Sequence, residues 1–160
     1  MARLPAGLTI RTYEPRDHDA VWRLHLEGVR RGPHDLPVPS HFDDDLRDVE
    51  SSYLGEASCF WVADSPDGLV GMTAIQRIDA ETGRLRRMRV TEAWRRRGVA
   101  QALLDTATGF CRAQGYRRLI LDTTEQQTEA HRLYERNGFT FLGHRMLGVF
   151  RVRDYVKDLG

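Results

Sequence analysis

Seven arginines fall between residues 84 and 97 of this 160-residue chain, and the same stretch holds one acidic residue, Glu92. Three of them, Arg95 to Arg97, stand directly before Gly98 and an apolar-periodic segment that predicts a helix. Like charges repel one another, and the positive end of the helix dipole makes their crowding less favourable still. The arrangement therefore indicates that this helix start binds an anion.

A phosphate group fits such a site. The first backbone N–H groups of a helix have no intrahelical partner, so they can donate to a phosphate. Gly98 has no Cβ to block close approach, and Ala100 is also small. A solvated run of charges is the alternative interpretation. The coincidence of arginines, glycine and helix start favours the phosphate site, whereas the sequence lacks the P-loop and dinucleotide-binding motifs.

The composition argues against several classes of protein. The chain is 41% hydrophobic and 29% charged with a formal net charge of +1, so bulk charge does not favour a nucleic-acid binder. Cys59 and Cys111 lie in apolar runs, which predicts buried thiols and no disulfide framework or metal site. The sequence shows no signal peptide and no membrane-spanning stretch. We therefore expect a cytoplasmic protein that binds neither nucleic acid nor a membrane.

The periodicity of apolar residues predicts eleven elements in the order β-α-α-β-β-β-α-β-α-β-β. The expected strands are residues 8–15, Cys59–Ala63, Leu69–Ile78, 83–92, 116–124, 139–144 and 145–159. The strand at 83–92 alternates with one small slip, and the strand at 116–124 reads as buried on both faces. This order predicts one α/β (α+β) domain over residues 1–160, with a mostly antiparallel mixed sheet flanked by about four helices.

The predicted helices have recognisable ends. Asp17 is expected to cap the first helix and Ser40 the second, which follows a proline-rich loop at residues 30–40. The third helix spans Gly98 to Gln114 and ends before Gly115. Its buried stripe is predicted to carry Val99, Leu103, Thr106 and Phe110. A fourth helix ends at Asn137-Gly138.

Two segments resemble motifs of the GNAT N-acetyltransferases. Residues 89–104, "RVTEAWRRRGVAQALL", resemble the family's acetyl-coenzyme A signature, Arg/Gln-x-x-Gly-x-Gly/Ala after a strand that ends in Val. Residues 130–139, "AHRLYERNGF", resemble its A-x-x-L-Y-E-x-x-G-F motif. The resemblance runs from about Phe60 onward, and the predicted element order agrees with the GNAT fold.

The resemblance implies acetyl-CoA as co-substrate and an amine as acceptor. It implies that Arg95 to Ala100 hold the diphosphate and that the backbone of Met88 and Val90 pairs with the pantetheine arm as an added strand would. Gln127 stands where relatives often have an asparagine. The implied cofactor-binding residues are Met88, Arg89, Val90, Arg95, Arg96, Arg97, Gly98, Val99, Ala100, Gln127 and Tyr134.

The implied reaction is acetyl transfer from acetyl-CoA to a primary amine of a small molecule or peptide, by direct attack in a ternary complex. Tyr134 takes the place of the general acid that protonates the leaving thiolate. A phenol of pKa about 10 and a thiolate of pKa about 8.5 make this transfer uphill by roughly 2 kcal/mol. The alternative interpretation of Tyr134, from helical spacing alone, is a core tyrosine. Relatives also commonly dimerise through their terminal strands, so the resemblance makes a homodimer one possibility and leaves the oligomeric state open.

No general base is named. Many relatives carry a glutamate near the position of Arg84, which cannot act as a base. The remaining candidates are Asp79, Glu81, His25, His34, His131 and His144. This gap supports a second hypothesis, a GNAT-like module that binds acyl-CoA without catalysis.

Two further polar groups have open roles. Asp122 and Thr123 could face the acceptor or the next helix, which Thr124 is expected to cap. The acidic cluster at residues 43–50 is either a solvated helix face or an attractor for a cationic amine.

Overall fold

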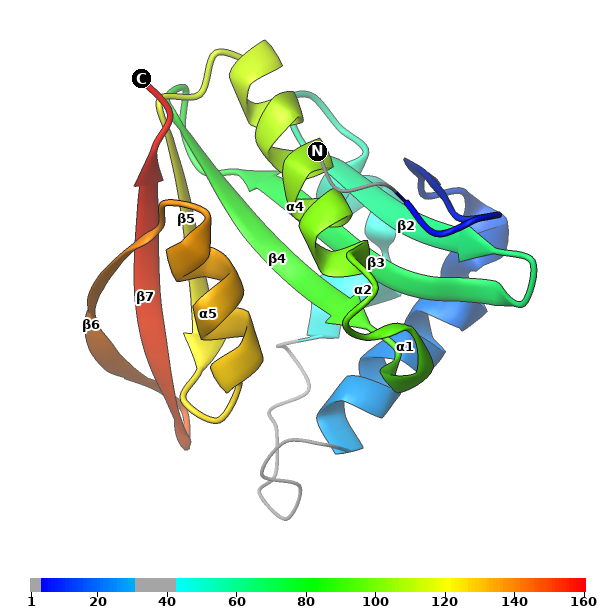
Figure 1. The fold of residues 1–160 in the computed structure, drawn as a ribbon. Helices are drawn as coiled ribbons and strands as arrows, with labels where there is room; N and C mark the ends of the chain where they lie inside the picture. Colours follow the sequence, from blue (N-terminus) through cyan, green and yellow to red (C-terminus); the bar gives the residue numbers. More distant parts are fainter. Residues whose placement is uncertain (1–3, 31–42) are drawn as a thin grey trace.

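The computed structural model describes residues 4–30 and 43–160. Seven strands form one mixed sheet in the order β1-β2-β3-β4-β5-β7-β6 (Figure 1). The strands are β1 Thr9–Thr12, β2 Cys59–Ser65, β3 Gly68–Arg77, β4 Thr82–Val90, β5 Arg118–Thr124, β6 Thr140–Leu147 and β7 Phe150–Asp158. Neighbouring strands are antiparallel except β4 and β5, which are parallel. The predicted sheet and element order are confirmed.

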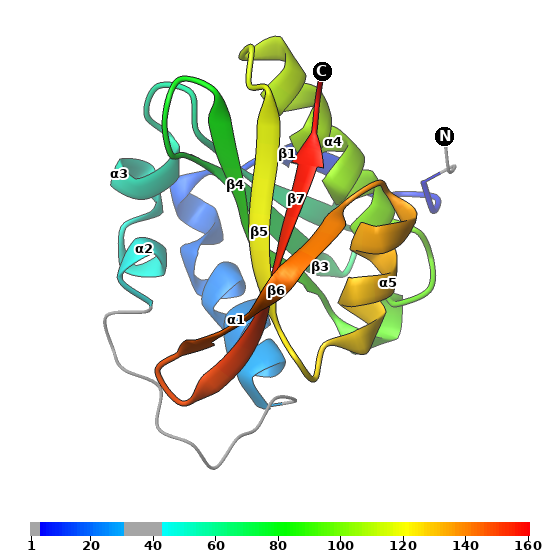
Figure 2. The same ribbon diagram turned by 90° about the vertical axis from the view of Figure 1, so that its left-hand side faces the viewer.

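Helices cover both faces of this sheet (Figure 2). On one face lie α1 His18–Arg30, α2 Asp44–Arg47 and α3 Val49–Tyr53, and on the other lie α4 Val99–Ala113 and α5 Thr128–Arg136. Short 3₁₀ turns, η1 Pro15–Asp17 and η3 Glu92–Trp94, precede α1 and α4. The described residues thus form five α-helices where about four were predicted. None of these helices is both long and apolar enough to cross a membrane.

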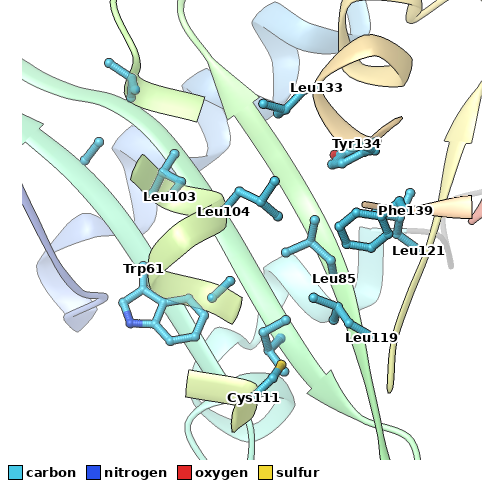
Figure 3. Packing of buried hydrophobic residues seen from close by; sticks show 14 of the residues in the cluster. Trp61, Leu85, Leu103, Leu104, Cys111, Leu119, Leu121, Leu133, Tyr134 and Phe139 are labelled. Carbon is cyan, nitrogen blue, oxygen red and sulfur yellow. The ribbon is translucent and has the colours of Figure 1, made fainter. Parts of the chain in front are cut away.

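Each face of the sheet has its own core. The cluster under α4 and α5 includes Trp61, Leu103 and Leu119, and Figure 3 shows it from close by. The cluster under α1–α3 includes Val21 and Tyr53. Burial on α4 follows an i, i+4 stripe of Val99, Leu103, Ala107 and Cys111. The predicted positions Thr106 and Phe110 are only half-buried, because they flank this stripe.

The sheet opens between β4 and β5. Their parallel pairing covers only Thr82–Arg84 of β4 and Arg118–Ile120 of β5. Beyond it β5 continues along β7 and β4 along β3, so the strands separate towards the end where α5 begins (Figure 1). Within the described residues no strand pairs with this edge of β4 over residues 85–90. The slip in the alternation of β4 is a bulge, at which Arg87 adopts a left-handed φ of 61°.

Three predicted details near the first two helices need correction or lie outside the structure. Asp17 does not cap α1; it closes η1 by accepting from the Glu14 N–H at 2.8 Å and from Arg11 at 2.8 Å. The proline-rich loop and the predicted cap Ser40 fall outside the described residues. The described part of the second helix is two short helices, because Asp48 leaves helical geometry and accepts from the Ser51 N–H.

Two predictions around β5 are also wrong. The strand is not buried on both faces: Leu119 and Leu121 are buried, whereas Ile120 and Asp122 line a cavity. Thr124 does not cap α5, because Gln127 occupies the N-cap and donates its N–H to the Thr124 carbonyl at 3.1 Å. The last hairpin is where it was expected, but β6 runs on to Leu147 and the turn falls at residues 148–149.

Candidate active site at the opening between β4 and β5

The helix start that the sequence singled out has the predicted geometry. Gly98 is the N-cap of α4 with φ 83°, a left-handed conformation that favours glycine. Arg96, two residues earlier, is also left-handed at φ 61°. The first N–H groups of α4 have no intrahelical partner, so they remain able to donate to a bound anion. This corner follows directly from the end of β4, through the η3 turn.

The arginines of this corner are on the surface. Arg96 is 87% exposed and lies 3.6 Å from Glu129 on α5, while Arg95 lies 3.9 Å from the same carboxylate. The Arg97 guanidinium stacks over Trp94, 5.0 Å from the ring centroid. Exposed ion pairs contribute only about 0–1 kcal/mol. These side chains could therefore turn to a phosphate at little cost.

The edge of β4 supplies the second part of the site. Met88 and Val90 pack their side chains into the α4-side core, and the strand edge beside them faces the opening rather than β5. An extended ligand arm can add to such an edge as a strand does. The edge and the α4 start are contiguous, so one ligand could span both.

Tyr134 lies in the same opening. Its ring is buried and packs edge-to-face on Phe139, with the centroids 5.6 Å apart (Figure 3). Burial raises the pKa of Tyr134, although the charge of Arg89 opposes the shift. The phenol is therefore neutral at physiological pH and suited to donating a hydrogen bond. The same burial makes full proton transfer from Tyr134 more uphill than its ordinary pKa implies.

Gln127 is held beside this region. Its Oε1 accepts a hydrogen bond of 2.9 Å from the hydroxyl of buried Thr123. The amide nitrogen retains its donors. Thr123 thus orients Gln127 rather than facing a ligand itself.

Arg89 has an unusual environment that the sequence did not reveal. No hydrogen bond or ion pair joins its side chain to any residue that the structure describes, and its Nε is buried without a partner. The guanidinium lies against Gly28 of α1, where a Cβ would stand only 2.5 Å from Nε. Burial and the neighbouring Arg87 charge lower the pKa of Arg89. Within residues 4–30 and 43–160, Arg89 is thus a cation without an ion-pair partner at the α1 face of β4.

The acidic cluster divides between two environments: Asp44, Asp48 and Glu50 are exposed, as a solvated helix face predicts, whereas Asp45 is not. Asp45 is almost fully buried and accepts a hydrogen bond of 2.9 Å from Nε of Arg87, and the Tyr53 hydroxyl donates to the same carboxylate. Burial opposes ionisation of Asp45, but Arg87 outweighs it and holds the pKa of that carboxyl below its usual range. Asp44 is exposed and pairs with Arg47. Asp45 therefore anchors α2 to β4 and is neither solvated nor open to an amine.

The candidate bases are mostly engaged elsewhere. His131 contacts the Thr124 carbonyl and Arg153 through its two nitrogens. Asp79 and Glu81 lie at the β3–β4 turn, where β4 and β5 are paired, and so away from the opening. His34 lies outside the described residues.

The two other histidines differ in environment. His25 is buried with Nε2 3.1 Å from Asp43 and Nδ1 buried without a partner. Burial lowers the pKa of His25. His144 lies 2.9 Å from Glu125. No base is identified by this geometry.

A cavity of about 410 Å³ lies between β4, β5, β6 and β7. The Asp122 carboxylate lines it and accepts from Arg84 at 2.6 Å and from Arg145 at 2.7 Å. Asp122 is thus neutralised by two arginines, and the position of Arg84 serves an ion pair. No group of three or more metal-ligating side chains occurs among the described residues.

Comparisons with known proteins agree with this geometry. The sequence profile of the acetyltransferase (GNAT) family matches residues 19–139. Human N-acetyltransferase 8 is 40% identical over 112 residues, which is 66% of this chain and 49% of that protein. N-acetylaspartate synthetase of Danio rerio is 40% identical over 101 residues, 62% of this chain and 36% of that protein. The chain spans about half the length of the first of these relatives and about a third of the second.

Solved structures share the fold. An acetyltransferase from Streptococcus agalactiae superimposes with a TM-score of 0.87 at 25% identity, covering 97% of this chain and all of that one. yncA of Salmonella typhimurium, solved with its cofactor acetyl-CoA, superimposes with a TM-score of 0.75 at 15% identity and covers 96% and 95% of the two chains. The motif at Gly98, the opened sheet and the family profile over three quarters of the chain converge: this protein belongs to the acetyltransferase (GNAT) family.

Proposed function

We propose that this protein transfers the acetyl group of acetyl-CoA to a primary amine of a small molecule or peptide. One observation carries the proposal: the unpaired edge of β4 leads directly to the left-handed Gly98 at the start of α4, with Tyr134 buried beside it. The relatives named N-acetyltransferase support the same reaction.

The residues present fit acetyl-CoA. The N–H groups at the start of α4, with Arg95 to Arg97, would hold the diphosphate, and Gly98 and Ala100 leave room for it. The backbone of Met88 to Val90 would pair with the pantetheine arm. Gln127, oriented by Thr123, would donate to the same arm.

The bound thioester supplies an electrophilic carbonyl and a thiolate leaving group. Backbone N–H groups on the open edge of β4 would donate to the oxyanion that forms on this carbonyl. The neutral Tyr134 hydroxyl would donate to the sulfur as negative charge develops there. Since the geometry identifies no base, the amine would lose its proton to water, and positioning of the two substrates would supply most of the acceleration.

Thiol release with a panel of amines tests this function. The panel contains amino acids, peptide N-termini, polyamines and aminoglycosides, and it includes aspartate because of the relative's name. We expect acetyl-CoA to bind and at least one amine to be acetylated, with slower turnover for Tyr134→Phe. If acetyl-CoA bound with no turnover of any amine, the protein would instead be a non-catalytic acyl-CoA-binding module.

We also propose that two copies of the chain associate through β6. This strand is an edge of the sheet, and an edge strand has unpaired backbone groups that can join a second sheet. It exposes Phe141, Leu142 and Met146, of which Leu142 is 63% exposed.

The two cysteines are unpaired, which is compatible with the reducing cytoplasm that we propose as the location.

A further inference from the structure

We propose that Arg89 binds a carboxylate of the acceptor, so that the substrates of this enzyme are amines that also carry a carboxylate, such as amino acids. The inference rests on the proposed function and specifies its acceptor. It starts from the side chain whose positive charge has no partner among the described residues.

The position of Arg89 separates it from the cofactor's phosphates. Arg89 is the register partner of Met72, which belongs to the core under α1–α3. Its guanidinium reaches Gly28 on α1, whereas Gly98 and α4 cover the opposite face of the sheet. Arg89 is nevertheless close enough to Tyr134 for the two side chains to interact electrostatically. The cation therefore lies on the face of β4 opposite the start of α4 and within electrostatic reach of Tyr134, and this is where we place the acceptor.

Among the residues that the structure describes, the charges around Arg89 are not balanced. Arg86 and Arg87 share Asp45, and Arg87 and His25 contact Asp43, so the nearby carboxylates already have partners. A half-buried guanidinium with no carboxylate is costly unless a ligand supplies one. The planar guanidinium group of an arginine can donate two parallel hydrogen bonds to one carboxylate. The positive potential of these arginines would disfavour the protonated form of an amine beside them, and it would also disfavour an acceptor with several positive charges.

Gly28 is part of this arrangement. A glycine inside a helix costs roughly 1 kcal/mol relative to alanine. Here a Cβ would meet Nε, Cδ and Cζ of Arg89 at 2.5 to 2.9 Å. The glycine thus makes the space that the guanidinium occupies, and a methyl group there would displace it without breaking the helix.

Matched acceptors test the inference. Each amino acid that the native enzyme acetylates is compared with its carboxamide, whose amine is intrinsically easier to deprotonate. We expect the native enzyme to prefer the free acid, and Arg89→Met to lower kcat/KM for the acid about 100-fold, the scale of a lost charge-assisted contact, but for the amide less than about 3-fold. Gly28→Ala should lower the ratio of kcat/KM for the acid to kcat/KM for the amide about 10-fold. This variant provides the test if Arg89→Met does not fold. Arg23→Met, which removes an exposed arginine of α1, is the control that should change neither value.

Calorimetry gives a readout that does not need turnover. Binding of the amino acid to the protein saturated with CoA should be lost in Arg89→Met, while acetyl-CoA affinity stays within about 2-fold. Equal loss for acid and amide, or weakened acetyl-CoA binding, would overturn the inference, and so would a native preference for amides. If the protein acetylated no amine but still bound carboxylates in a way that depends on Arg89, the proposed function would be wrong. The proposed carboxylate site would still be supported.

Discussion

Tyr134 and His25 are both buried near the opening of the sheet, and burial keeps both of them neutral. It raises the pKa of the phenol and lowers the pKa of the imidazole, because in each case the low-polarity surroundings disfavour the charged form. Neutral Tyr134 can donate to a developing thiolate. Neutral His25 can hold Asp43 without adding a further positive charge beside Arg87 and Arg89.

The role of Tyr134 predicts a rate effect that does not change with pH. Tyr134→Phe should lower kcat by about 10- to 100-fold with little change in the KM for acetyl-CoA. Because its pKa is raised, the ratio of native to variant kcat should stay constant from pH 7 to about 10. Tyr155→Phe is the matched control, since this ring packs in the same cluster but its hydroxyl contacts Glu135. A ratio that collapses above pH 8 would contradict the role.

His25 predicts how stability depends on pH. Its pKa is lowered in the folded protein, so below the ordinary histidine pKa of about 6.5 the unfolded chain binds more protons than the native one. The stabilisation is present above that pH and is lost as pH falls below it. Urea unfolding at pH 7.5, 6.0 and 5.0 should show a smaller acid loss in His25→Gln than in the native protein. Equal slopes in the native protein and in His25→Gln would refute the prediction.

At the scale of elements, the start of α4 and the bulge in β4 arrange the site. Gly98 turns the chain from the open edge of β4 into α4, so in the proposed function the backbone donors of both elements would face one ligand. The bulge at Arg87 lets adjacent arginines Arg86 and Arg87 both reach Asp45 of α2. In the proposed function the start of α4 would hold the cofactor, while the bulge in β4 ties α2 to the sheet.

Gly98→Ala tests the helix start. The left-handed φ of 83° should cost an L-residue about 1–2 kcal/mol of stability, and the added Cβ should weaken acetyl-CoA binding at least 10-fold. Gly115→Ala imposes the same conformation, φ 82°, at the other end of α4, where nothing lies within 4 Å of the new Cβ. Calorimetry should therefore find normal acetyl-CoA affinity in Gly115→Ala at a similar loss of stability. Parallel loss of affinity in both variants would argue against a phosphate site at Gly98.

Asp45→Asn tests the tie between α2 and β4. Removing this carboxylate leaves the buried Arg87 without its main partner, which should lower the free energy of unfolding by about 3 kcal/mol. Asp44→Asn affects an exposed pair with Arg47 and should change it by less than about 0.5 kcal/mol. Denaturant unfolding measures both. Similar effects of the two changes would mean that Asp45 is not the buried anchor described above.

At the scale of the whole molecule, the two faces of the sheet hold different parts of the candidate site. The α4 and α5 face carries the proposed cofactor corner, the α1–α3 face carries Arg89, which has no ion-pair partner in the described part of the chain, and the opening between β4 and β5 joins them. The far edge of the sheet, β6, is left with exposed apolar side chains.

The proposed dimer follows from that edge. Leu142→Lys with Met146→Lys places charges on β6 and should convert a dimer into a monomer of 18.4 kDa in sedimentation experiments. Acetyl-CoA binding should persist, because the β4 edge and α4 lie elsewhere in the sheet. A native protein that sediments as a monomer at all concentrations would refute the association.

The sequence by itself determined the features that depend on local chemistry. Helix ends at Gly98, Gly115 and Asn137-Gly138, the order of the strands and the slip in β4 all follow from residue types at fixed spacing, and the structure contains each of them. These features rely on backbone conformation and side-chain periodicity, which a few neighbouring residues specify.

Only the tertiary structure decided which charges are paired. Asp45 meets Arg87 across 42 positions in the sequence, and Asp122 meets Arg84 and Arg145. Arg89 lies against Gly28 and has no ion-pair partner among residues 4–30 and 43–160. The sequence alone indicates charged residues at these positions but not their partners. Which charges meet depends on how distant elements pack, which no local spacing encodes.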